Sequence, residues 1–313
     1  VLAETSVMGF DPKIIFKGYS DKVKIIKNNN TTTIKTNDPF TELKKLLGTS
    51  NDQKYRYLGG AVGVVNYDSI RLVENISEKN NPTQPIMEFG IYDDGLLYDN
   101  VHKKLFYFYH DVNRFDKLIM SNDSFDEFHS SEVTPNMDKE KFSKIVNKAK
   151  QYIHDGDIFQ VVLSRKFAFE TSGDNLTLYK TLRKLNPSPY MYHLKQDSKT
   201  IIGASPEMLV RITDDKVETF PIAGTRKITD NEEKNKALSD ELIHDEKELA
   251  EHTMLVDLGR NDIGRVCKYG TVHPESLMEI KRFSHVQHIV SHVVGNLDSK
   301  NDMFDAFQAV FPA

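Results

Sequence analysis

The stretch from residue 219 to residue 262 constrains the fold of this chain more than any other. It begins with Thr219-Phe-Pro-Ile-Ala-Gly-Thr-Arg226, a strand-like run broken by a glycine, and continues into a long charged segment. Apolar residues at helical spacing predict one helix over residues 231–258. The core stripe of this helix is Leu238, Leu242, Leu249 and Val256. The sequence therefore predicts a strand that is followed, after a short connection, by a long helix.

Two glutamates give this helix a chemical character. Glu248 and Glu251 lie at positions i and i+3, so both project from one face. Mg2+ prefers such oxygen ligands and often binds one or two carboxylates. The Gly224-Thr225-Arg226 turn suits an anionic substrate, because backbone N–H groups, a hydroxyl and a fixed cation converge there. The pattern indicates an enzyme for a small, acidic, Mg2+-bound molecule, although a solvated helix face also explains many glutamate pairs.

Composition excludes several other classes of protein. The net charge is −5 and the basic residues do not cluster, which argues against a nucleic-acid surface. No apolar run has the length of a membrane span and no secretory leader is visible, so we expect a cytoplasmic protein with no membrane partner. The single cysteine, Cys267, excludes an internal disulfide and is expected to be a structural thiol.

The N-terminal part, residues 1–120, is predicted to be β-rich. Short apolar runs alternate with turn residues, and Asn28-Asn-Asn30 marks a hairpin. Residues 121–138 are polar and turn-rich and are the predicted linker. The expected strands are Val23–Lys27, Thr32–Thr36, a glycine-broken Tyr57–Tyr67, Leu96–Asp99 and Leu105–Tyr109.

The remainder, residues 139–313, combines helices and strands and is predicted to be the catalytic region. Helices are expected over 142–153, ending near Gly156, and over 174–185. Strands are expected at Ile158–Ala168, 199–203, 208–213 and 216–221.

Both ends of the sequence are expected to be interior to a longer protein. The chain starts without Met, inside a strand-like segment. It stops in the apolar run Phe304–Ala313, which needs a surface to pack against, whereas chain ends are usually polar and frayed. We therefore expect a fragment that lacks both termini.

Six motifs, in order along the chain, resemble the chorismate-utilising enzymes and, within them, component I of anthranilate synthase. The match begins near residue 55 and is strongest from residue 139 onward. The motifs are Gly156–Ser164, Asn186–Met191, Ser205-Pro-Glu207, Pro221–Arg226, Glu248–Asp262 and Phe283–Ser291.

This resemblance implies both a fold and an activity. The implied fold is α+β, a large anthranilate-synthase-like sandwich of mainly antiparallel sheets with flanking helices, to which residues 1–120 contribute. The implied activity is that of a lyase in tryptophan biosynthesis, with Mg2+ as cofactor. It aminates chorismate at C2 with ammonia and then eliminates pyruvate to give anthranilate.

The resemblance also implies roles for individual residues. Glu251 resembles the Mg2+ ligand and Glu248 the neighbouring acid. Gly224 and Thr225 resemble the substrate-binding turn, with Thr225 also counted among the catalytic residues. A glycine needed only for positive φ is a common alternative at position 224.

Two further residues resemble catalytic groups. Glu207 matches a carboxylate near the departing C4 hydroxyl, where a general acid is needed, although a glutamate after proline could equally be a turn residue. His288 matches a histidine placed near the ring during pyruvate elimination. His285, His288 and His292 also share helical spacing and could mimic a zinc set, but surface or core histidines are the commoner explanation for His285 and His292.

Two positions separate the subfamilies. Relatives that add water to chorismate carry a lysine base where this chain has Gln160, which cannot take a proton from water. Relatives that make aminodeoxychorismate typically carry a nucleophilic lysine where this chain has Ala223. Both residues favour anthranilate synthase over its relatives.

The implied partners follow from functions that the visible sequence does not supply. Cys267 does not lie in a Gly-x-Cys-x-Gly elbow, so ammonia is expected from a separate glutamine amidotransferase subunit or from solution. Pro189, Tyr190 and Met191 match half of a tryptophan feedback site, whose N-terminal half is not recognisable here. The motif expected directly after Ala313 is absent, so residues 1–313 alone are predicted to be inactive.

Two alternatives remain open. One is aminodeoxychorismate synthase component I, which Ala223 disfavours. The other is a catalytically silent paralogue that binds tryptophan or docks the glutaminase.

Overall fold

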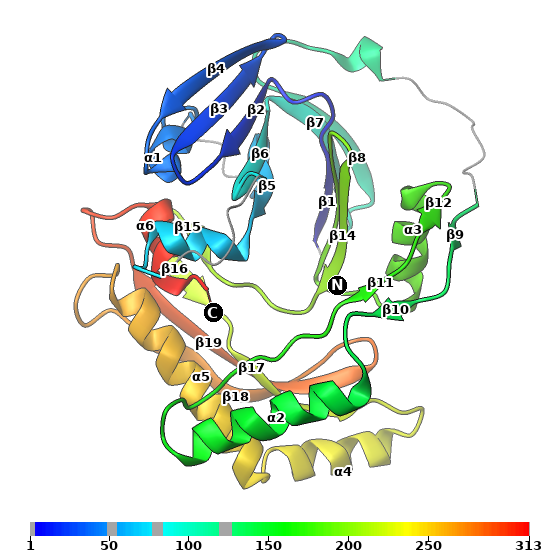
Figure 1. The fold of residues 1–313 in the computed structure, drawn as a ribbon, viewed down its shortest axis with the longest axis vertical. Helices are drawn as coiled ribbons and strands as arrows, with labels where there is room; N and C mark the ends of the chain where they lie inside the picture. The colour runs from blue at the N-terminus through cyan, green and yellow to red at the C-terminus, as the bar shows by residue number, and fades with distance from the viewer. Residues whose placement is uncertain (1–3, 49–54, 77–83, 119–126, 313) are drawn as a thin grey trace.

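A computed structural model describes residues 4–48, 55–76, 84–118 and 127–312 (Figure 1). Helices and strands are mixed, and the strand pairs that we describe are all antiparallel. In Figure 1 the elements follow an open arc, with the N-terminal sheets at the top and the C-terminal sheet and its helices at the bottom. The predicted α+β class is confirmed.

The first sheet has five strands in the order β4-β3-β2-β6-β5. The predicted hairpin is confirmed, and Asn28 and Asn29 both adopt positive φ, at 51° and 64°, as a two-residue hairpin turn requires. Gly63 packs so closely on the neighbouring strand that an added Cβ would lie 2.0 Å from the Glu88 carbonyl oxygen, which explains the glycine-broken run. The strands are β2 (Ile14–Gly18), β3 (Lys22–Lys27), β4 (Asn30–Lys35), β5 (Gly60–Val65) and β6 (Met87–Tyr92).

A second sheet joins β1 (Thr5–Met8), β7 (Asp94–Asp99) and β8 (Lys104–Tyr109) in the order β1-β7-β8. The predicted pairing of residues 96–99 with residues 105–109 is confirmed.

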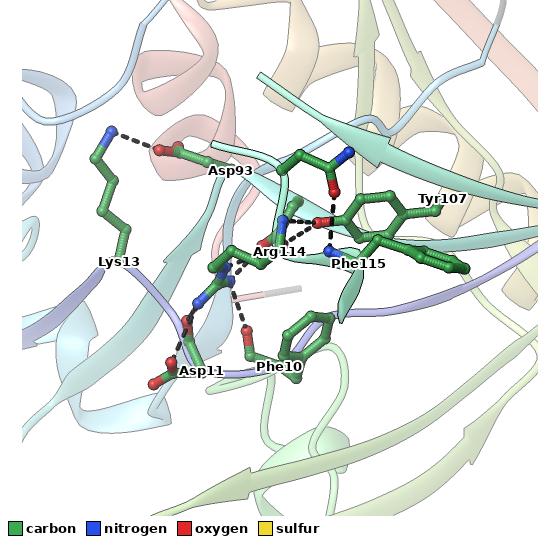
Figure 2. Close-up of polar contacts among 9 residues, drawn as sticks. Phe10, Asp11, Lys13, Asp93, Tyr107, Arg114 and Phe115 are labelled. Atoms are coloured by element: carbon green, nitrogen blue, oxygen red, sulfur yellow. Dashed lines mark hydrogen bonds and ion pairs between the residues drawn. The ribbon is translucent and has the colours of Figure 1, made fainter. Parts of the chain in front are cut away.

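Arg114 closes one end of this sheet (Figure 2). Its guanidinium pairs with Asp94, which is 1% exposed, and donates to the carbonyl oxygens of Phe10 and Asp11. The Tyr107 hydroxyl donates to Asp94 at 2.7 Å and accepts the Arg114 backbone N–H at 2.8 Å. The cluster ties the segment between β1 and β2 to the ends of β7 and β8.

The end of the chain completes the N-terminal core. Helix α6 (Met303–Val310) packs against α1 (Pro39–Lys44), with the Phe40 ring 6.0 Å from Phe304 and 5.8 Å from Phe307. These aromatic rings border the buried cluster that includes Phe16, Val23, Leu43 and Met87. The apolar run that begins at Phe304 therefore packs against a surface, as its sequence predicts.

Two short 3-10 helices follow strands of these sheets. The first, η1 (Tyr67–Leu72), follows β5, and the second, η2 (Phe115–Lys117), follows β8.

The C-terminal sheet is built around the long strand β19 (Val286–Asn296). One edge of β19 pairs with β18 (His273–Arg282), and the other pairs with β16 (Lys216–Thr219) and then β17 (Ile222–Lys227). Strand β15 (Arg211–Thr213) extends the sheet beyond β16. The buried core between this sheet and its helices includes Val217, Val256, Ile263, Val293 and Ala306.

The remaining elements flank these sheets. The predicted helices over 142–153 and 174–185 are confirmed as α2 (Lys139–His154) and α3 (Asn175–Leu185). The hairpin of β13 (Tyr190–Gln196) and β14 (Lys199–Ser205) contacts α3. Short bridging strands are β9 (His129–Ser130), β10 (Thr134–Pro135), β11 (Phe167–Ala168) and β12 (Thr171–Ser172).

The strand predicted over Ile158–Ala168 is wrong except at its last two residues. No strand of the described residues pairs with 158–166, so its backbone lacks the ladder partner that a strand requires. Phe159 is 90% exposed and Val162 is 88% exposed. The apolar pattern is therefore present in the sequence without the sheet that would bury it.

The single helix predicted over 231–258 is also wrong, because the structure has two. Helix α4 (Glu232–Leu242) ends and α5 (Glu246–Gly264) begins after a short break. Asp245 starts the second helix by accepting the backbone N–H groups of Lys247 and Glu248. Leu242 and Val256 of the predicted stripe are buried in the two separate helices.

Cys267 is buried in the C-terminal core, and burial raises its pKa to about 11. Such a thiol stays protonated and unreactive, in agreement with the structural role predicted. Among the described helices, none combines the length and apolar character needed to cross a membrane.

Candidate functional site

Strand β17 forms the centre of the candidate site. A register shift between Ala223 and Thr225 makes a β-bulge, and Gly224 at its apex has φ of 67°. An added Cβ there would lie 2.9 Å from Leu242 and 3.3 Å from the Glu248 carboxylate. Glycine is thus required both for the backbone conformation and for the close approach of Leu242 at the end of α4 and Glu248 in α5.

The bulge binds His288 from the neighbouring strand. The Nδ1 atom of His288 lies 2.8 Å from the Gly224 carbonyl oxygen and 3.1 Å from the Thr225 hydroxyl. A carbonyl oxygen only accepts, so this contact assigns the proton to Nδ1. In the neutral ring Nε2 then carries the free lone pair and is available as a base.

The helical spacing of the three histidines was misleading, since His288 and His292 lie in strand β19. His292 is held by Glu218 and Glu275, each at 3.0 Å, and its ring stacks 4.1 Å from that of Phe220. Within the described ranges, no group of three His, Cys, Asp or Glu side chains is arranged to hold a metal ion. His292 therefore belongs to a structural ion-pair network.

Arg226 holds the start of α5 against β17. Its guanidinium lies 3.1 Å from Glu241, 2.9 Å from Asp245 and 3.6 Å from Glu248. Asp245 is also the N-cap of α5, so the contact fixes the helix terminus itself. The predicted acid Glu248 therefore sits beside the Gly224 bulge.

Glu251 lies on the same turn of α5 and differs from Glu248 in its surroundings. It is half-buried, and its carboxylate makes no hydrogen bond or ion pair with any other residue that the structure describes. A free carboxylate beside a second one provides the hard oxygen donors that Mg2+ selects, with substrate oxygens and water able to complete the shell. The donor chemistry of these two carboxylates thus suits the predicted cation, and Glu251 stays its predicted ligand.

Glu207, which precedes β17 in the chain, lies at the start of that strand, where the Ile222 backbone N–H bonds to its carboxyl. The Ser205 hydroxyl accepts the Glu207 backbone N–H at 3.3 Å, which shapes the Ser-Pro-Glu turn. Although Glu207 remains exposed as a residue, desolvation raises the pKa of its carboxyl, and the Ile222 backbone N–H opposes this more weakly. The direction of this pKa shift is the one that a general acid needs.

The predicted inhibitor-site residues Pro189, Tyr190 and Met191 lie at the start of β13. The pKa of Arg211 is raised chiefly by Glu218 and more weakly by Tyr190 and Glu4.

The structure brings the predicted residues Glu207, Gly224, Thr225, Glu248 and His288 to β17 and its immediate neighbours. Sequence reasoning missed Asp245 and the buried pair of His252 and Ser291. Asp245 with Glu248 has the spacing of a capping box, which could have marked the helix start. The His252–Ser291 contact has no comparable signal in the sequence.

Comparison with known proteins identifies the family to which the chain belongs. The family model for chorismate binding enzymes matches residues 3–313. Anthranilate synthase component 1 of Methanothermobacter thermautotrophicus is 39% identical over 317 residues, covering 100% of this chain and 68% of that protein. Aminodeoxychorismate synthase component 1 of Bacillus subtilis is also 39% identical, over 98% of this chain and 70% of that protein.

Solved structures agree on the fold. Anthranilate synthase component I from Streptococcus pneumoniae superimposes with a TM-score of 0.85 at 32% identity, covering 100% of this chain and 73% of that one. An isochorismate synthase from Bacillus anthracis, at 21% identity and a TM-score of 0.61, shares the fold. The motifs, the full-length match and these relatives together show that the chain belongs to the chorismate-binding enzyme family.

Proposed function

We propose that this chain is the large subunit of an anthranilate synthase, which converts chorismate and ammonia to anthranilate, pyruvate and water. The observation that carries the proposal is the bulge at Gly224. The Gly224 carbonyl oxygen and the Thr225 hydroxyl both contact Nδ1 of His288, which leaves Nε2 as the base. The preceding residue, Ala223, offers no amine that could act as a covalent nucleophile.

Substrate binding is assigned to the Gly224–Thr225 turn, with the carboxylates of α5 beside it. Glu251 would hold Mg2+, with Glu248, which pairs with Arg226, as the neighbouring acid. When bound, the cation neutralises the ring carboxylate of chorismate and helps to delocalise charge. Arg226 keeps two further carboxylates, Glu241 and Asp245, engaged at the start of the helix.

The first step is amination. Ammonia attacks C2, the two ring double bonds shift, and the bond from C4 to its hydroxyl breaks. The departing hydroxyl takes a proton from Glu207 to leave as water, and the new ammonium group returns a proton to the Glu207 carboxylate. The raised pKa of Glu207 favours this proton donation.

The second step is elimination. His288 Nε2 removes the proton from C2, the bond from C3 to the enolpyruvyl oxygen breaks, and the ring becomes aromatic. The leaving enolpyruvate takes up a proton to become pyruvate. Thr225, hydrogen-bonded to His288, holds the imidazole in place.

The partners belong to the same proposal. A glutamine amidotransferase subunit supplies the ammonia in the cytoplasm, and tryptophan binds near Pro189, Tyr190 and Met191 as feedback inhibitor. The Bacillus subtilis relative keeps aminodeoxychorismate synthase as an alternative, since its identity equals that of the first relative. Ala223 is the feature that favours anthranilate as the product.

The test uses the natural full-length protein with chorismate, Mg2+ and ammonium. Anthranilate fluorescence is followed over time, and the product is identified by mass and chromatography. We expect anthranilate, and its loss in Glu251→Ala. A para-aminated product would instead establish the aminodeoxychorismate alternative, and bound but unchanged chorismate would establish the silent paralogue.

A further inference from the structure

The geometry points to His252 and Ser291 as the buried contact that positions the carboxylate-bearing turn of α5 against β17. His252 is a positioning residue, since it acts through Glu248 and Glu251. The inference rests on the proposed function, because those two carboxylates are its assigned acid and metal ligand.

His252 and Ser291 connect the helix directly to the middle of the sheet. Both are 0% exposed, and His252 Nε2 lies 2.7 Å from the Ser291 hydroxyl. Ser291 lies in β19, on which α5 packs. A short polar contact inside an apolar layer has a narrow range of geometry, so it fixes the position of the helix more sharply than apolar packing does.

The same hydroxyl also binds a third element. The backbone N–H of Met278 in β18 donates to Ser291 Oγ at 3.0 Å. Met278 has φ of 53° and lies in an irregular stretch of that strand, between Ser276 and Glu279. Because Oγ accepts from Met278, its one proton is free to be donated to His252 Nε2. Helix α5 and strands β18 and β19 thus meet at one atom.

This contact lies one helical turn from the site. Glu248 is four residues before His252, so both occupy one face of α5. An added Cβ on Gly224 would lie only 3.3 Å from the Glu248 carboxylate, which shows how tightly that carboxylate is seated. Glu251 directly precedes His252 and is rotated about 100° round the helix from it. A shift of His252 along β19 therefore moves both carboxylates relative to the bulge.

His252 is a poor choice for stability alone. Its Nδ1 is buried with no hydrogen-bond partner among the residues that the structure describes. A buried polar atom without a partner is unfavourable, and an apolar side chain at this position would avoid it. The contribution of His252 therefore comes from the directed hydrogen bond that its Nε2 accepts from Ser291.

The experiment measures binding of Mn2+, a paramagnetic probe for the divalent-cation site, by electron paramagnetic resonance on the natural full-length protein. We expect Ser291→Ala and His252→Leu each to weaken Mn2+ binding about ten-fold, the lower end of the effect of losing a residue that orients a metal ligand. The double variant should lose no more than either single variant, because both remove one contact. His252→Gln, which can still reach Ser291, should restore most of the affinity.

Ser239→Ala is the matched control. Ser239 donates to Gln287 of β19 at 2.7 Å, a helix-to-sheet contact of equal length made by α4. Its loss should leave Mn2+ affinity unchanged. An equal loss in Ser239→Ala, or unaltered binding in Ser291→Ala, would overturn the inference alone. If Ser291→Ala does not fold, equal affinities of His252→Leu and His252→Gln would overturn it, and ten-fold separation would support it. Absence of Mn2+ binding by the unaltered protein would overturn the metal role in the proposed function and this inference together.

Discussion

Two arginines, Arg114 in the N-terminal half and Arg226 in the C-terminal half, each gather several acceptors, with different results. Arg114 pairs with Asp94, whose side chain is 2% exposed, and its other contacts are mostly backbone carbonyl oxygens. The side-chain partners of Arg226 are three carboxylates whose side chains are between 19% and 60% exposed, and its guanidinium also donates to the Thr225 carbonyl oxygen. The central carboxylate of the Arg114 cluster is shielded from solvent, whereas the carboxylates of the Arg226 cluster are accessible and can exchange partners.

The difference shows how an ion pair becomes part of a functional site. A buried pair with all its hydrogen bonds made fixes a fold, because breaking it strands a charge away from water. A cluster with spare carboxylates near a free one, Glu251, can admit a cation without breaking a buried pair. Of the four predictions below, those on Glu251, Arg114 and Glu241 test this contrast, and that on Glu218 tests a buried carboxylate outside both clusters.

Glu251→Gln should have the largest effect, since the free carboxylate is the assigned cation ligand. We expect kcat/KM for anthranilate formation at saturating Mg2+ to fall about 10²–10³-fold, equivalent to about 3–4 kcal/mol of transition-state stabilisation. Glu246→Gln, an exposed change in the first turn of the same helix, is the control. A similar fall in both variants would show that the negative charge of the helix terminus matters and not a bound cation.

Arg114→Ala should destabilise the protein by about 3 kcal/mol, because it leaves Asp94 buried without its cation. Urea unfolding followed by circular dichroism measures this. Asp11→Asn, which removes a partner whose side chain is 78% exposed, should cost less than about 0.5 kcal/mol. A loss below 1 kcal/mol in Arg114→Ala would mean that the N-terminal cluster is as adjustable as the C-terminal one.

The stability of the protein should decrease as the pH is lowered, because Glu218 becomes protonated. Desolvation alone would raise its pKa, but Arg211, Lys216 and His292 lower it to about 2. A carboxyl whose folded pKa is depressed stabilises the fold above its unfolded value, so this contribution is lost as the pH falls from about 4.5 to 2. We expect Glu218 to account for about 2 kcal/mol of that loss, after solvent screening is allowed for. Urea midpoints of the unaltered protein and Glu218→Gln should therefore converge across this range.

Glu241→Gln should have the smallest effect. Its side chain is 60% exposed, so its pairing with Arg226 should contribute only about 0.3 kcal/mol to stability. Asp245→Ala provides the contrast, with an expected loss of about 1 kcal/mol, because Asp245 also caps α5. Equal losses in thermal unfolding would show that the capping role is unimportant.

Local patterns predicted the elements that depend on local physics. The Asn28-Asn29 turn, the periodic helices α2 and α3 and the glycine-broken strand β5 all follow from rules that act over a few residues. The break between α4 and α5 was missed because the leucine stripe continues in phase across it. The signal lay instead in the capping geometry of Asp245.

Contacts between distant residues could not be predicted from one sequence. The strand expected at 158–168 failed because the pattern says nothing about whether a pairing partner exists. The site residues were found through the family motifs, whereas the His252–Ser291 contact, spanning 39 residues, joins a helix to a strand whose register only the fold determines. Spacing also misled at His288 and His292, since an interval of four residues occurs on one face of a strand as well as of a helix.

The packing of α6 on α1 has a consequence for synthesis of the protein on the ribosome. Lys44 and Asp302, which pair between these helices, are separated by 258 residues. At a translation rate of 5–20 residues per second, helix α1 waits roughly 13–50 seconds for the aromatic rings of α6. During that interval Phe40 and its neighbours lack the rings of Phe304 and Phe307 that cover them in the finished fold.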